Sequence, residues 1–133
     1  MIFAIDFDGT IVQDRYPKIG KLNPKAAQFI QELHRLGHTF ILWTNRTGRD
    51  LDMAVCFLRA VGLKPDYVNE NTPENVARYE NDSRKIFADM YIDDRNSGGV
   101  VWPFNVLAWR SNKQQDVVSC PKCRPAHRKE ENK

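Results

Sequence analysis

Residues 1–10 read MIFAIDFDGT, an apolar run that ends in two aspartates, a glycine and a threonine. The residues from Ile2 to Ile5 are all apolar and do not alternate, which is typical of a strand buried on both faces of a parallel sheet. Asp6 and Asp8 follow this run directly. A buried carboxylate is costly unless it is paired or bound to a metal. The stretch therefore predicts a parallel sheet with a specialised site at the end of its first strand.

The size and composition indicate one globular domain. A chain of 133 residues, 41% hydrophobic and 28% charged, can bury one sizeable core. No apolar run approaches the roughly 18 residues that a membrane span needs. The first residues also have no basic stretch before an apolar core and no small-residue cleavage site, so they do not resemble a signal peptide. We therefore expect a cytoplasmic protein with no membrane partner.

The positive charge of the chain is concentrated at its end. Residues 110–133 carry seven Lys or Arg and three Asp or Glu, a net charge of +4, whereas the whole chain carries +3. We expect a catalytic core over residues 1–110 and a basic, flexible tail over residues 111–133. Such a tail can favour nucleic acid.

The cysteines do not form a disulfide framework. They are Cys56, Cys120 and Cys123, an odd number with two crowded near the end of the chain. Cys120, Cys123 and His127 offer three zinc ligands where a structural site needs four. The sequence leaves zinc binding open.

Strand-like and helix-like segments alternate along the chain. Asn23 is a suitable N-cap and Pro24 a suitable first residue for a helix. We expect strands at 2–5, 39–43, 66–68, 88–92 and 106–109, and helices at 24–36, 51–61 and 73–81. The alternation predicts an α/β fold, a Rossmann-like three-layer sandwich with a central parallel sheet.

Polar residues follow three of the expected strands. They are Asp6 and Asp8 after the first, Thr44, Asn45 and Arg46 after the second, and Asp93 and Asp94 after the fourth. In open α/β sheets the carboxyl ends of the strands form the ligand site. Four carboxylates gathered there would repel each other, by about 4 kcal/mol for each pair at 4 Å in a dielectric of 20. A hard cation with oxygen ligands removes this repulsion, and magnesium is usual beside phosphate.

The remaining groups suit a phosphate. Thr44 and Asn45 can donate hydrogen bonds to its oxygens, as can the turn amides around Gly9. Lys85 can supply positive charge. Arg46 could do the same, although its position near the mouth favours a solvated loop. Asp94 could pair with Arg95 or Arg84 instead of a metal. The sequence thus predicts a phosphate site beside the metal.

These residues resemble the haloacid dehalogenase superfamily, which consists mostly of phosphatases. IDFDGT resembles its first motif, Thr44 in ILWTN its second, Lys85 its third and the pair in YIDD its fourth. The resemblance covers roughly residues 1–109 and looks closest to small bacterial or phage hydrolases.

The resemblance implies a role for each matched position. Asp6 would be the nucleophile, forming an aspartyl-phosphate, and a magnesium ligand. Asp8 would serve as general acid and base, with its backbone carbonyl facing the metal. Thr44 and Lys85 would hold the phosphoryl group, and Asp93 with Asp94 would complete the metal site.

The spacing leaves no room for a cap domain. Thr44 follows Asp6 by 38 residues and Lys85 follows Thr44 by 41, which the expected elements fill. We expect an open site that acts on a phosphorylated small molecule or nucleic-acid end, or that a second subunit covers. The leading hypothesis is a magnesium-dependent phosphomonoester hydrolase. The alternatives are a polynucleotide phosphatase using the basic tail, a receiver-like phospho-accepting domain and an inactive binding domain.

Overall fold

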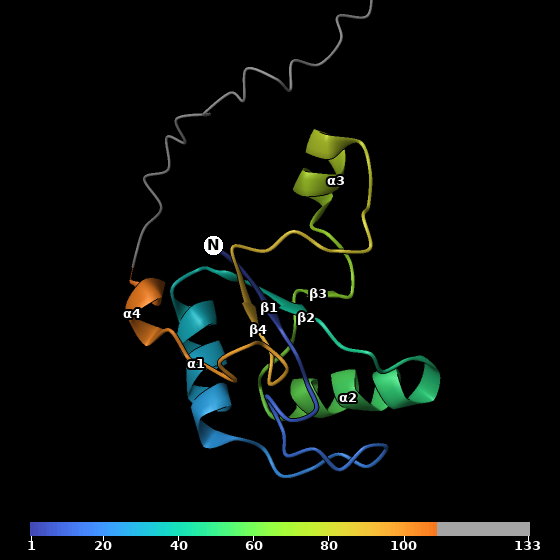
Figure 1. Ribbon diagram of the computed structural model, residues 1–133, viewed down its shortest axis with the longest axis vertical. Coiled ribbons are helices and arrows are strands. Elements are labelled where there is room, and N and C mark those ends of the chain that lie inside the picture. Colours follow the sequence, from blue (N-terminus) through green and yellow to red (C-terminus); the bar gives the residue numbers. More distant parts are fainter. Residues whose placement is uncertain (109–133) are drawn as a thin grey trace, which may run out of the picture.

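The structure, a computed structural model, describes residues 1–108 (Figure 1). Its elements follow in the order β1 (Ile2–Ile5), α1 (Pro24–Arg35), β2 (Thr39–Leu42), α2 (Gly48–Ala60), β3 (Tyr67–Val68), α3 (Pro73–Tyr79), β4 (Met90–Ile92) and α4 (Phe104–Leu107).

The four strands form one parallel sheet in the order β3-β2-β1-β4. Ile5 at the end of β1 pairs with Leu42 of β2 on one side and with Ile92 of β4 on the other. The residues that follow these three strands therefore lie at the same edge of the sheet. The expected α/β class with a central parallel sheet is confirmed.

The first helix begins and ends where its local signals predict. The side chain of Asn23 accepts a hydrogen bond from the Lys25 N–H at 3.0 Å, and Pro24 is the first helical residue. Gly37 follows the helix with a φ of +77°, a conformation that glycine adopts readily. This helix packs its apolar face on the sheet through Phe29, Ile30 and Leu33.

The two faces of the sheet are covered differently. Phe3, Ile5, Phe40 and Leu42 belong to the main core, which also includes buried residues of α1 and α2. On the opposite face, Ala4 and Ile41 pack with Ile86 and Ala88, from the segment that leads into β4. Helix α3 has no buried residue and stands apart from the sheet (Figure 1).

The expected strand at 106–109 is wrong. Its described residues instead end α4 (Phe104–Leu107) and continue into a helical C-cap at Ala108. The rings of Trp102 and Phe104 pack on Phe29 of α1, with centroid distances of 5.4 and 5.3 Å. Leu107, one turn after Phe104, is buried in the same core. The apolar residues therefore follow a helical spacing toward α1, which an apolar run too short to show periodicity does not reveal.

The intervals between strands hold no additional domain within residues 1–108: a loop and α1 separate β1 from β2, while α2, β3 and α3 lie between β2 and β4. The expected tail over residues 111–133, with Cys120, Cys123 and His127, lies outside the described residues. In the described part of the chain, no helix combines the length and apolar character needed to cross a lipid bilayer.

Candidate active site

A cavity of about 380 Å³ opens at the carboxyl ends of β1, β2 and β4. It is lined by Asp6, Asp8, Asp14, Tyr16, Thr44, Asn45, Arg46, Asp93, Asp94 and Arg95. The structure therefore brings together most of the residues that the sequence assigned to the site.

Three carboxylates form an acidic triad in this cavity. Asp6, Asp93 and Asp94 each offer a carboxylate oxygen, and these oxygens lie within 4.8 Å of one another. The hydroxyl of Thr10 fixes the two strand ends relative to each other. It donates to Asp6 Oδ2 at 3.1 Å and accepts from the Asp94 N–H at 3.0 Å. The threonine of the DGT sequence thus holds two members of the triad together.

Burial and the neighbouring charges disfavour ionisation of the triad carboxylates. Burial, and then the nearby charge of Asp93, raise the pKa of Asp6 from 3.8 to about 7, against the lowering effect of hydrogen bonds from Phe7 and Thr10. Burial and the hydrogen bond with Asp93 also raise the pKa of Asp94. Closely spaced oxygen donors whose ionisation is opposed by their neighbours fit a hard divalent cation.

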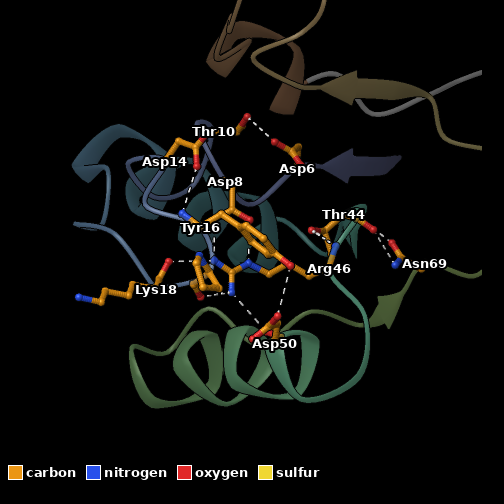
Figure 2. Close-up of polar contacts among 11 residues, drawn as sticks. Asp6, Asp8, Thr10, Asp14, Tyr16, Lys18, Thr44, Arg46, Asp50 and Asn69 are labelled. Atoms are coloured by element: carbon orange, nitrogen blue, oxygen red, sulfur yellow. Dashed lines mark hydrogen bonds and ion pairs between the residues drawn. The ribbon is translucent and has the colours of Figure 1, made fainter.

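The carboxylate of Asp8 is turned to Arg46 instead of the triad. Asp8 Oδ2 accepts from Arg46 Nε and Oδ1 from Nη2, both at 2.7 Å (Figure 2). This two-pronged geometry is the strongest form of an arginine–carboxylate pair. The Arg46 side chain is 1% exposed and that of Asp8 18%, so water screens the pair little. The sequence expectation that the Asp8 side chain belongs to the acidic cluster is therefore corrected.

The guanidinium of Arg46 has no N–H left for a phosphate. Its remaining N–H groups donate to the carbonyl oxygens of Pro17 and Lys18 at 3.0 Å and of Asp50 at 3.5 Å. With the two bonds to Asp8, all five N–H groups of an arginine are used. Arg46 therefore joins the loop after β1 to α2, which is not the phosphate-binding role expected from the sequence.

Thr44 and Asn45 lie at the end of β2, where the sequence places them. The backbone of Thr44 forms a double hydrogen bond with the side chain of Asn69, at 2.8 Å in each direction. The Thr44 hydroxyl accepts from the backbone N–H of Arg46 at 3.2 Å. The proton of this hydroxyl is therefore available to donate. Asn45 is exposed on the cavity wall. Both side chains are thus placed to donate to an anion.

Neither the Gly9 N–H nor the Lys85 ammonium is free for a phosphate at the triad. The Gly9 N–H donates to the Val12 carbonyl at 2.9 Å. Lys85 lines a separate cavity of about 400 Å³, where its ammonium lies 5.7 Å from the centre of the Tyr91 ring. The phosphate-binding roles expected of these two groups are therefore not supported.

Four residues of the site were not singled out as phosphate or metal ligands from the sequence. Asp14, Tyr16 and Arg95 line the cavity of the triad, and Asn69 supports Thr44. The sequence positions of Asn69 and Arg95 could have pointed to the site. Asn69 directly follows a strand, and Arg95 directly follows the acidic pair after another strand. Tyr16 carries a weaker one, as an aromatic residue in the polar loop that follows the DGT sequence.

Comparisons with known proteins find a similar solved structure. No family model matches the chain, and no curated protein matches it. A solved structure of a conserved protein from Bacteroides thetaiotaomicron is similar, with 42% sequence identity and a TM-score of 0.69. The match covers 80% of this chain and 85% of that protein. The chain therefore belongs to the same family as this conserved protein of Bacteroides thetaiotaomicron.

Proposed function

We propose that this protein is a magnesium-dependent phosphomonoester hydrolase of the haloacid dehalogenase type, which works through an aspartyl-phosphate. The observation that carries the proposal is the triad of Asp6, Asp93 and Asp94 in one cavity with Thr44 and Asn45. Acidic oxygens for a cation and hydrogen-bond donors for an anion thus meet at one point. The proposed compartment is the cytoplasm, and no membrane partner is needed.

The triad residues would hold the metal. Their donors are all carboxylate oxygens, which Mg²⁺ prefers, and their spacing lets one ion be shared. When bound, the ion would neutralise the triad and the charge of the phosphoryl group. A cation there would also favour the ionised form of Asp6, which a nucleophile must adopt.

The chain's own residues supply the other steps. A carboxylate oxygen of Asp6 would bond to phosphorus while the bond from phosphorus to the leaving oxygen breaks, and the leaving oxygen would take a proton from solvent. A water molecule would then attack phosphorus, release Asp6 and give its proton to solvent, because Arg46 holds both oxygens of the Asp8 carboxylate. Passing through a covalent intermediate replaces one difficult step by two easier ones. Thr44 and Asn45 would donate to the phosphoryl oxygens in both steps.

Arg95 is the cation that we assign to substrate binding. It lines the cavity, whereas Arg46 is fully hydrogen-bonded within the protein and Lys85 lies in another cavity. The Arg95 N–H also donates to Asp93 Oδ1 at 2.8 Å, which fixes the backbone beside the triad.

The test is hydrolysis of p-nitrophenyl phosphate with Mg²⁺ and with a chelator. Turnover should require the cation, and Asp6→Asn should lower kcat by roughly 10³-fold or more, as loss of a nucleophile does. Asp52→Asn, an exposed change on α2, is the matched control and should have no effect. Mass spectrometry after an acid quench should find phosphate on Asp6. Full turnover by Asp6→Asn would overturn the proposal.

A further inference from the structure

The guanidinium of Arg46 lies close to two aromatic rings near the triad. Its central carbon is 5.1 Å from the ring centre of Phe7 and 5.2 Å from that of Tyr16. Phe7 is fully buried, whereas Tyr16 is 60% exposed. Tyr16 therefore presents an exposed aromatic ring beside a cation that the protein holds in place.

The ring of Tyr16 is held in place although it is exposed. Its hydroxyl donates to Asp50 Oδ2 at 3.3 Å, and its backbone N–H donates to Asp14 Oδ1 at 3.2 Å (Figure 2). The neighbouring guanidinium of Arg46 is itself fixed by its pair with Asp8. These contacts restrict the ring before any ligand arrives. Ordering the ring therefore costs little entropy when a ligand packs on it.

We propose that Tyr16 is the stacking platform for the base of a nucleoside monophosphate, either free or at the end of a nucleic acid. The inference rests on the proposed function, since it names the substrate class of the same site. Tyr16 and the triad line one cavity, so a ligand could place its ring on Tyr16 and its phosphate at Asp6. A volume of about 380 Å³ lies within the usual range for small-molecule sites.

The rest of the wall suits the same ligand. The second carboxylate oxygen of Asp14 can accept from an amino group of a base or a hydroxyl of ribose. A flat base is stabilised by packing on an aromatic face, and such stacking does not depend on which base is present. A sugar phosphate without a base would reach the triad but leave the Tyr16 ring uncovered.

The experiment compares adenosine 5′-monophosphate with ribose 5-phosphate, in turnover and in binding. Binding is measured by calorimetry on Asp6→Asn protein with Mg²⁺, which does not depend on turnover. Tyr16→Leu removes the ring, and Tyr16→Phe keeps it while losing the bond to Asp50. Tyr79→Leu is the matched control, because Tyr79 is an exposed tyrosine that lines the separate cavity.

Tyr16→Leu should weaken the binding of adenosine 5′-monophosphate by roughly tenfold, as loss of one base stack does. Tyr16→Leu should change the affinity for ribose 5-phosphate by less than about twofold. Tyr16→Phe should keep most of the preference for adenosine 5′-monophosphate over ribose 5-phosphate. Loss of the preference in Tyr79→Leu, or equal losses for both ligands in Tyr16→Leu, would overturn the platform.

Two further arms separate the related conclusions. A 5′-phosphorylated oligodeoxyadenylate that binds more tightly than the free nucleotide identifies a nucleic-acid end as the source, and the reverse identifies a free nucleotide. Selective binding on Tyr16 without hydrolysis would support the platform and reject the hydrolase. Hydrolysis with equal preference in wild type and Tyr16→Leu would reject the platform and retain the hydrolase.

Discussion

The α-carbon of Gly9 faces the carboxylate of Asp94 so closely that a β-carbon on residue 9 would collide with Asp94 Oδ2 and Cγ. The backbone at Gly9 also has a φ of +82°, which residues with a side chain rarely adopt. The glycine of the DGT sequence therefore leaves space for a member of the triad. This role differs from the phosphate contact expected of it.

Gly9→Ala should affect the metal site more than the fold. The Asp94 carboxylate is the free end of a side chain and can swing aside. The loss of stability should therefore come mainly from the strained backbone at residue 9, about 1–2 kcal/mol. Displacement of Asp94 removes one ligand, and Mg²⁺ affinity should fall at least tenfold, roughly the effect of disturbing a metal ligand. Urea unfolding and calorimetric Mg²⁺ titration measure the two effects.

Gly37→Ala is the control for Gly9→Ala. Gly37 has a φ of +77°, and a β-carbon there meets no atom within 4 Å. Its stability loss should be similar, with Mg²⁺ binding unchanged. Equal Mg²⁺ affinity in both variants would exclude Asp94 from the site.

Arg46→Met should strongly destabilise the protein, because it leaves the partly buried Asp8 charge without its partner. Breaking a buried ion pair in this way costs about 3–5 kcal/mol. The double variant Asp8→Asn/Arg46→Met should lose less than the sum of the single changes. Arg35→Met, which breaks the exposed pair with Glu32 on α1, should hardly change the melting temperature. Additive losses would show that the pair is not energetically coupled.

Stability without metal should fall as the pH rises from about 4 to about 7, because of Asp6. Its pKa is about 7 in the folded protein against 3.8 ordinarily, so over this range the folded state holds a proton that the unfolded state has released. Asp6→Asn should remove the penalty and stabilise the protein by roughly 1–2 kcal/mol near pH 8, with little change near pH 4. Urea unfolding in a chelator at both pH values measures this, with Asp52→Asn as control. A gain that is equal at both pH values would show that the ionisation of Asp6 is not its cause.

Lys85→Met should leave the turnover of p-nitrophenyl phosphate within about twofold, because the ammonium lies in the separate cavity over Tyr91. Arg95→Met should lower kcat/KM by roughly tenfold, the cost of losing one cation that binds the phosphate. Kinetics over a range of substrate concentrations separates KM from kcat. A large loss in Lys85→Met alone would show that the lysine moves to the triad on substrate binding.

The sequence predicts well those features that depend on local chemistry. Asn23 and Pro24 place the start of α1 correctly because a helix cap involves neighbouring residues. The buried run before Asp6 and the polar residues after β2 and β4 place one edge of the sheet, because parallel strands align their ends.

What the sequence does not predict depends on side-chain direction and on long-range contact. Asp8 and Arg46 are 38 residues apart, and strand-end positions alone do not reveal that their side chains turn to each other. Lys85 precedes β4 by only a few residues, but its segment crosses the opposite face of the sheet through Ile86 and Ala88. Its distance along the chain from Asp93 therefore says little about its distance in space.

The separation of α3 from the sheet has a consequence for local opening. The helix contributes no buried residue, so unfolding it exposes no core side chain. Its amide hydrogens should exchange through local opening, at a free energy well below that of global unfolding. The triad, held by β1 and β4, stays intact while α3 opens. A surface segment of this kind also tolerates inserted chain. The connection through α3 is therefore where a covering domain could be added without disturbing the core or the acidic site.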